Sequence, residues 1–427
     1  MRVPLIVAAL LALGAPSLDA QRPGAPPRAR GDSTDRARAD SAAADSAARS
    51  GRRAARPLPS PDTTGGARIV SVPLPTLGVV GDLVTDLSPD GTTQVDDSRF
   101  GVREVELALQ AGVDAYFRAD VFLAFSDLDV AAVRQATLTT AALPWRLEAS
   151  LGRFPLPFGK QNPLHRHDLH TIDYPYVVRR FLGEDGGRGT GARVSRVFTG
   201  FGAQEIVLAV VDGLVPTDGL LAIDAPNRLL GGLGYLGRLR STWAPTRATG
   251  VELSLSGMTG RRLQPLIGTV VTDIGVVNAV VARQSTLGAD LTVRWHPSPS
   301  RGFLVQGELM HQLNEREASI RPRIPLNPAT GGPFYGGPVG DFTGGYLYGR
   351  GQLTRRLVLG VRGDRLQDPL DLDGSILTAG SGYLELYPSD HSRLVAAYQR
   401  RSVAGIDENL VLVQATFAVG PHGLVRW

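Results

Sequence analysis

Apolar and polar residues alternate along most of the chain after about residue 70. In residues 104–114, EVELALQAGVD, the residues Val105, Leu107 and Leu109 fall on one face, and Glu104 and Glu106 fall on the other. A period of two residues is typical of a β-strand, because successive side chains point to opposite sides of the sheet. This segment therefore predicts a strand with one apolar and one polar face.

The next segment, YFRADVFLAFS, repeats the alternation after a turn near Asp114, with Val121 and Leu123 opposite Arg118 and Asp120. Similar segments follow to the end of the chain, among them WRLEASLGRF, GVELSLSG, RRLVLGVRGDRL and NLVLVQATFAV. Together they predict about sixteen strands. Tight links such as LTRRLV and YPSDHSRL alternate with long links at 259–285 and 313–342. Short turns at one end and long loops at the other are typical of outer-membrane barrels.

The length and charge of these strands favour a transmembrane antiparallel barrel over a soluble β-sandwich. Tilted strands of about ten residues match a bilayer, whereas soluble strands are commonly shorter. Charged residues in the middle of a strand would face the water of a barrel lumen. The predicted lumen-facing residues are Glu104, Glu106, Arg118, Asp120, Arg146 and Glu148. The predicted lipid-facing residues are Val105, Leu107, Leu109, Val121, Leu123, Trp145 and Leu147.

The first 66 residues have a different composition. Residues 1–20 have a charged start, a short apolar run and small residues before Gln21, which predicts a secretory signal peptide. Residues 21–66 are rich in Ala, Arg, Asp and Pro and hold no aromatic residue, so we expect a disordered leader. The barrel is expected over residues 67–427. The chain has no cysteine, so disulfides and thiolate metal sites are excluded.

The net charge of +4 does not indicate a nucleic-acid partner. Residues 1–66 contain ten Arg and six Asp, which leaves 35 basic and 35 acidic residues in the rest of the chain. The predicted barrel is therefore neutral overall. The basic excess lies in the leader.

Several segments resemble outer-membrane porins of the phosphate-selective porin O/P type. The similar stretches are REVELALQAGVDAYFRADVFLAF, VRQATLTTAALPWRLEASLGRFPLPFG, GYLYGRGQLTRRLVLGVRGDRL and the C-terminal LVLVQATFAVGPHG. The resemblance covers most of residues 70–427 and implies a barrel, passive transport and a homotrimer as one candidate assembly. Phosphate-binding members place rows of lysines in the pore, whereas this chain has only Lys160. The substrate therefore does not carry over.

The stretch GRFPLPFGKQNPLHRHDLH departs from alternation. Pro155 and Pro157 cannot donate ladder hydrogen bonds, so a strand should end there and a loop should follow to about Gly191. We expect this loop to fold into the lumen, set conductance and give a mild anion preference, increasing below about pH 6.5 as histidines become charged. The candidate constriction residues are Lys160, His165, Arg166, His167, Arg179 and Arg180. An exterior loop with solvated arginines is the alternative.

Other chemistry in this loop has weaker support. His165, His167 and His170 lie near Asp168 and Asp173, but without a HExxH helix or a second cluster at metal-site spacing we predict no metal site. A triad of Ser195, His170 and Asp173 lacks the G-x-S-x-G motif, and GEDGGRGTG at 183–191 lacks the G-K-[ST] ending of a phosphate loop. We therefore predict neither a catalytic residue nor a cofactor.

The sequence predicts a porin in the bacterial outer membrane that acts as a passive diffusion channel for small hydrophilic solutes. Its expected partners are outer-membrane lipid, the transported solutes or anions, and the barrel-assembly machinery, which is thought to read a terminal aromatic such as Trp427. An outer-membrane hydrolase and a structural barrel without transport are the alternatives.

Overall fold

The computed structural model describes residues 75–89, 91, 98–126, 132–141, 143–200, 202–212, 222–223, 232–272, 275–314, 341–367 and 375–420. The predicted signal peptide, the leader and Trp427 lie outside these residues. In the described part of the chain, no helix is long and apolar enough to cross a membrane.

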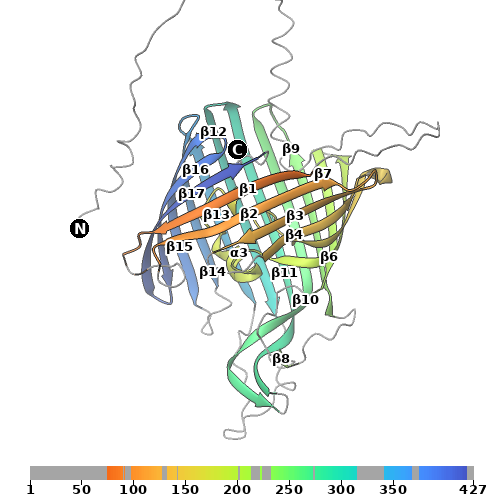
Figure 1. Cartoon of the computed structure of the whole chain (residues 1–427). Coiled ribbons are helices and arrows are strands. Elements are labelled where there is room, and N and C mark those ends of the chain that lie inside the picture. The colour runs from red at the N-terminus through yellow and green to blue at the C-terminus, as the bar shows by residue number, and fades with distance from the viewer. Residues whose placement is uncertain are drawn as a thin grey trace, which may run out of the picture. The chain divides into compact units, whose positions relative to one another are not determined.

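Sixteen antiparallel strands of the described residues form a closed barrel, as predicted. Each strand pairs with its neighbours in the chain, and the ring closes where β1 pairs with β17, for example at Val80↔Ala418. A further two-residue strand, β8 (Ala222–Ile223), pairs in parallel with β11 outside this ring order. Figure 1 shows the tilted strands of the wall. The barrel strands are β1 (Thr76–Asp86), β2 (Phe100–Gly112), β3 (Phe117–Phe125), β4 (Ala132–Thr140), β5 (Leu147–Pro155), β6 (Arg188–Gly200), β7 (Gly202–Val211), β9 (Gly234–Trp243), β10 (Thr249–Thr272), β11 (Gly275–Ser298), β12 (Arg301–Asn314), β13 (Phe342–Gln352), β14 (Leu357–Gln367), β15 (Ile376–Ser389), β16 (Ser392–Val403) and β17 (Ile406–Val419).

The links between strands are short at one end of the barrel and mostly longer at the other. The links β6–β7, β11–β12, β13–β14 and β15–β16 are tight turns, which confirms the predicted turns in LTRRLV and YPSDHSRL. The predicted long loop at 259–285 is wrong. Strands β10 and β11 continue through it as a hairpin that extends beyond the other strands (Figure 1). The ladder of backbone pairs continues there, with a register shift between Pro265 and Val270.

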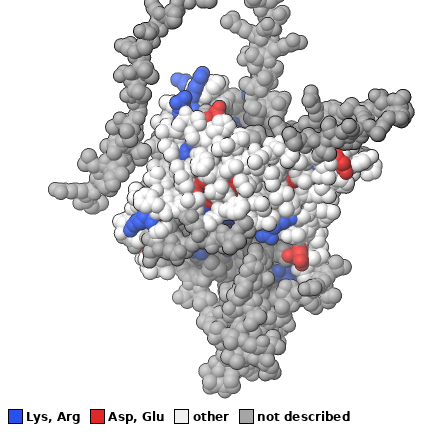
Figure 2. All heavy atoms as spheres, in the orientation of Figure 1, with Lys and Arg blue, Asp and Glu red and all other residues white. Residues whose placement is uncertain are grey.

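The two faces of the wall differ as the alternation predicts. On β2, Glu104, Glu106 and Ala108 are buried and face inward, whereas Leu109 is 36% exposed on the outside. Exposed outer leucines and valines recur around the ring, including Leu255, Leu309 and Leu347. In Figure 2 most atoms on the visible face belong to uncharged residues, and charged residues lie mainly toward its margins. This apolar outer band suits the hydrocarbon of a membrane.

Two β-bulges turn arginines inward against the alternation. The pairing of β1 with β2 shifts between Asp82 and Leu83, which leaves Arg103 as the extra residue. The pairing of β3 with β4 shifts between Phe122 and Leu123, which leaves Arg134 as the extra residue. An extra residue in one strand reorients its side chain. Both arginines consequently reach carboxylates inside the barrel.

The predicted strand positions of Trp145 and Arg146 are wrong. Both residues lie in a short 3-10 turn, η2 (Pro144–Arg146), with φ of 59° and 57°. Strand β5 begins at Leu147. Arg146 is exposed in this turn, so alternation along a strand does not place it in the lumen.

Candidate functional site in the lumen

Residues 156–187 leave the wall between β5 and β6 and fold into the barrel. They contain one 3-10 turn, η3 (Arg166–Asp168), and one helix, α3 (Tyr176–Leu182). Figure 1 shows α3 behind the β2–β4 part of the wall, and α3 contacts β13 and β14. We call residues 156–187 the lumen segment. Its inward fold is the geometry expected for this loop.

The base of the lumen segment is closed by one backbone hydrogen bond and by the side chain of Asn162. Strand β5 ends at Pro155 as predicted, and the Leu156 amide donates to the Gly187 carbonyl at 2.9 Å. The Asn162 side chain donates to the carbonyls of Leu156 and Gly187 and accepts from the Gly187 amide. These bonds hold the two ends of the segment together where it leaves the wall.

Gly159 lets the chain turn toward the far side of the barrel. Its φ is +63°, and a Cβ at this position would lie 1.6 Å from Oε1 of Glu308 on β12. The Gly159 amide donates to Ser256 Oγ on β10, and the Lys160 amide donates to Glu308 Oε1. The Lys160 ammonium pairs with Glu252 on β10 at 2.8 Å. The first turn of the segment is therefore fixed against β10 and β12.

An apolar core packs the lumen segment into the barrel. Each residue of this core is at most 3% exposed. The core consists of Leu156, Phe158, Leu169, Ile172, Tyr174, Tyr176, Val177, Val178, Phe181 and Leu182. Burial of side chains of this size stabilises each by roughly 1.5–3 kcal/mol relative to exposure. The segment is consequently a packed part of the interior.

Ion pairs attach the lumen segment to β1, β2 and β4. Arg103 bridges Asp82 on β1 and Asp173 of the segment, at 2.5 and 3.0 Å. Arg134 bridges Glu104 on β2 and Asp185 of the segment, at 2.6 and 2.9 Å. The two bulge arginines thus link the wall to the segment.

A second set of polar contacts attaches the segment to β13, β14 and β16. His170 contacts the buried Arg350 of β13 and stacks on Tyr348. The Tyr176 amide donates to Asp364, and Arg393 donates to the Leu169 carbonyl. The segment therefore crosses the lumen, because β4 and β12–β14 lie on different sides of the ring.

The predicted constriction residues do lie in the lumen segment, but most of them are paired with carboxylates. His165 Nδ1 lies 2.9 Å from Glu106 Oε2, and Arg166 pairs with Asp185. His167 is 2% exposed. Arg179 and Arg180 both pair with Glu184, so their positive charge is partly offset.

The histidines differ in how readily they gain charge. Burial lowers the pKa of His170, and the charges of Arg350 and Arg393 lower it further, to well below its ordinary value. Burial would also lower the pKa of His165, but the hydrogen bond and charge of Glu106 outweigh it and raise this pKa. The lowered pKa means that His170 gains positive charge only at more acidic pH than an ordinary histidine.

The predicted lumen-facing residues fall into two groups. Glu104 and Glu106 are 4% and 2% exposed and lie against the segment, so the expectation that they keep the lumen wet is wrong. Arg118, Asp120 and Glu148 lie on inner positions at the short-turn end, where the side chains of Arg118 and Glu148 are 44% and 39% exposed. Solvent therefore reaches the inner face along β3 and β5.

Sequence reasoning missed most of the wall residues that hold the segment. Arg103 and Arg134 break the alternation of apolar and polar positions. Only the β-bulges show that their side chains point into the barrel. Arg350, Arg362 and Arg393 do occupy inner positions of alternating strands, which was a usable signal. Their partners in the segment lie 180, 189 and 224 positions away in the chain, and no local pattern indicates them.

Ser195, His170 and Asp173, the residues considered as a catalytic triad, have separate contacts in the structure. Ser195 lies on β6 opposite Glu148, whereas His170 contacts Arg350 and Asp173 pairs with Arg103. Within the described residues, no hydrogen bond joins Ser195 to His170.

Comparisons with known proteins show similarity to outer-membrane proteins at the level of the fold. No family model matches the chain. A curated relative, an uncharacterised protein of Aquifex aeolicus (strain VF5), is 26% identical over 340 residues, which cover 76% of this chain and 69% of that protein.

Solved structures share the architecture at low sequence identity. The trimer form of OmpT, an outer-membrane protein of Vibrio cholerae, is 12% identical with a TM-score of 0.51, covering 81% of this chain and 100% of that one. An anion-selective porin of Comamonas acidovorans is 13% identical with a TM-score of 0.51, covering 82% and 99%. The channel DcaP of Acinetobacter baumannii is 12% identical with a TM-score of 0.50, covering 81% and 96%. The chain therefore shares the antiparallel β-barrel fold of these outer-membrane proteins.

Proposed function

We propose that the protein is a passive diffusion channel for small hydrophilic solutes, narrowed by the lumen segment, and that no catalytic step is involved. The observation that supports this proposal is the course of residues 156–187 across the barrel, fixed to β2 and β4 on one side and to β10, β12 and β14 on the other. A segment anchored in this way reduces the lumen to the space that it leaves along the wall. Porin selectivity depends on the charges that line such a space.

A mild anion preference is part of the proposal, but its best candidate residues are not the ones first expected. In the described residues, no carboxylate lies within 4 Å of the guanidinium groups of Arg188 and Arg193 on β6. Arg193 instead donates to Ser150 Oγ and lies over the Phe154 ring. An arginine without a carboxylate beside it retains more of its field than Arg179 or Arg180 beside Glu184.

Single-channel recording in a planar bilayer tests the proposal. Replacing residues 160–185 with a short Gly-Ser linker should raise the conductance several-fold, because the linker cannot cross the lumen. Arg193→Gln should shift the reversal potential in a salt gradient toward lower anion preference. Arg179→Ala with Arg180→Ala should have a smaller effect.

Arg400→Gln is the matched control, since Arg400 is exposed on the outer face of β16 and pairs with Asp407. A wild-type chain that conducts nothing, with conductance appearing only after the replacement, would mean that the segment is a plug and that the barrel is not an open channel.

A homotrimer is also proposed, with β13–β15 as the contacting wall. The outer positions Gly349, Gly351, Gly363, Gly380 and Gly382 have no other atom within 4 Å of a Cβ built on them, so they leave space on this wall beside exposed apolar side chains such as Leu347 and Val361. Gly380→Trp should reduce the trimer fraction in native mass spectrometry, whereas Leu255→Trp on β10 should not.

A further inference from the structure

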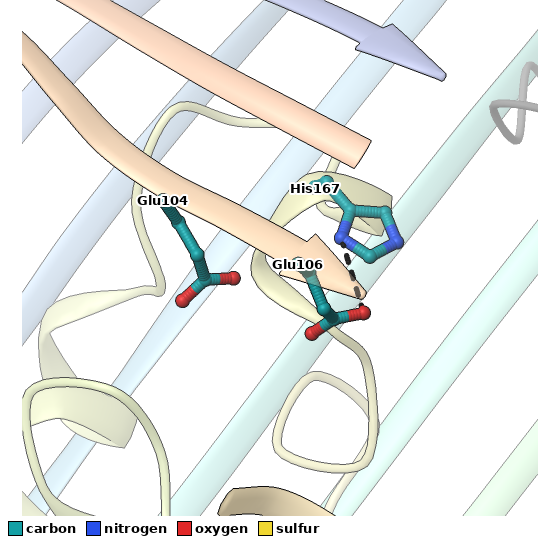
Figure 3. A group of neighbouring side chains, drawn as sticks. All are labelled: Glu104, Glu106 and His167. Atoms are coloured by element: carbon teal, nitrogen blue, oxygen red, sulfur yellow. Dashed lines mark ion pairs between the residues drawn. The ribbon is translucent and has the colours of Figure 1, made fainter. Parts of the chain in front are cut away.

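A cluster of metal-ligand side chains lies where the lumen segment meets β2. Glu104 and Glu106 project from β2 to the same side, and His167 approaches them from η3 (Figure 3). One ligand atom from each of the three lies within 4.8 Å of the other two, and all three residues are buried. Two carboxylates and an imidazole are a donor set that zinc and related ions accept.

The spacing of the central pair suits an ion better than a direct hydrogen bond. His167 Nδ1 and Glu106 Oε1 are 3.8 Å apart, which is too long for a hydrogen bond. Two ligands bonded to one zinc ion at about 2.0–2.2 Å can be separated by up to about 4 Å. An ion between these two atoms would therefore need only a small adjustment of the side chains.

The surrounding residues orient the three ligands. Arg134 donates to one oxygen of Glu104, which leaves the other oxygen as a ligand atom. His165 Nδ1 lies against Oε2 of Glu106, so that Oε1 faces His167. Asp168 Oδ1 lies 3.7 Å from His167 Nε2, which is too long for a hydrogen bond, but its charge on this side of the ring favours a proton on Nε2 and leaves the lone pair on Nδ1. Residues that hold ligands in this way are a usual part of protein metal sites.

We propose that Glu104, Glu106 and His167 bind one divalent transition-metal ion, with zinc as the representative ion, and that this ion fastens the lumen segment to β2. Water would complete the coordination. The ion would offset the charge of two carboxylates that are 4% and 2% exposed. The proposal is independent of transport, because it concerns the attachment of the segment and not the path of the solute.

Zinc titration of the full-length protein in detergent, after treatment with a chelator, tests the inference. Calorimetry should show one zinc ion per chain, and X-ray absorption should show only nitrogen and oxygen ligands. His167→Ala should abolish this binding, and Asp168→Asn should weaken it about tenfold. His391→Ala is the matched control, because His391 lies in the exposed β15–β16 turn and should leave binding unchanged.

If His167→Ala does not fold, Glu104→Gln provides the second variant, since it keeps the volume of the side chain and removes its charge. Weakened zinc binding in Glu104→Gln supports the site. Absence of stoichiometric binding in the wild type, or unchanged binding in both His167→Ala and Glu104→Gln, would overturn the inference.

Discussion

At the scale of single residues, the lumen segment depends on a few positions that no neighbour in the sequence can replace. Gly159 combines a left-handed backbone conformation with close approach to Glu308. Asp173 and Asp185 each receive an arginine from a β-bulge. Single residues therefore determine the direction in which the segment leaves the wall and the way it is attached in the lumen.

Gly159→Ala should loosen the segment. A Cβ at φ of +63° is strained, and Glu308 would have to move to make room for it. Strain of this kind costs about 1–3 kcal/mol. Thermal unfolding in detergent measures the loss, and Gly349→Ala on the open outer face should leave the midpoint nearly unchanged. Equal midpoints for Gly159→Ala and the wild type would show that this turn does not fix the segment.

The pKa of Asp185 predicts how the stability of the protein changes with pH. Burial would raise the pKa of Asp185, but the charges of Arg166 and Arg134 outweigh it and lower this pKa to about 2. A lowered pKa in the folded state contributes stability above the ordinary value near 4, and this contribution is lost only as the pH falls toward 2. Unfolding midpoints between pH 7 and pH 2 should therefore show the Asp185 contribution intact at pH 5. Asp185→Asn should lower the midpoint at pH 7 but much less at pH 2, and a constant difference across this range would contradict the assignment.

At the scale of the elements, alternation predicts the faces of the strands but not what covers them. Leu107 and Glu106 occupy opposite faces of β2 as expected. Glu106, however, faces His165 and His167 and not water. An inner position can therefore be as intolerant of change as an outer one.

Leu107→Arg should prevent or destabilise folding in a membrane, because it places a cation in hydrocarbon at a cost of about 2–4 kcal/mol near the midplane. Gln110→Arg is the suitable control, since Gln110 is an exposed inner residue that donates to Asp120. Heat-modifiable gel mobility reports the folded fraction. Similar folded fractions for the two variants would contradict the assignment of faces on β2.

At the scale of the whole molecule, the ring of strands closes within residues 76–419. The pairing of β1 with β17 extends from Val79↔Val419 to Asp86↔Leu412. The first and last strands of the sheet therefore pair with each other. A closed sheet leaves no edge strand unpaired in the membrane, where unpaired backbone groups are costly.

Deletion of residues 22–66 should consequently leave the barrel intact. These residues have no alternating pattern and precede the first strand of the ring. The shortened chain should insert into lipid and show the same heat-modifiable mobility as the full chain. Failure of the shortened chain to fold in detergent would show that the leader has a structural role.

The sequence by itself determined the barrel, its approximate strand number, the two faces of most strands and the point at which β5 ends. These features depend on a period of two residues and on proline, which act over a few neighbouring positions. The exceptions are local as well: Trp145 and Arg146 form a turn, and residues 259–272 and 275–285 belong to the paired strands β10 and β11.

Only the tertiary structure decided what fills the barrel. Alternation could not show that Arg103 and Arg134 turn inward, because a bulge depends on the register of the neighbouring strand. Nor could it show that Glu104, Glu106 and His167 meet, because β2 and η3 are about 60 residues apart in the chain. Contacts of this kind arise from the path of a folded segment across the lumen, and that path is set by packing against strands from the whole length of the chain.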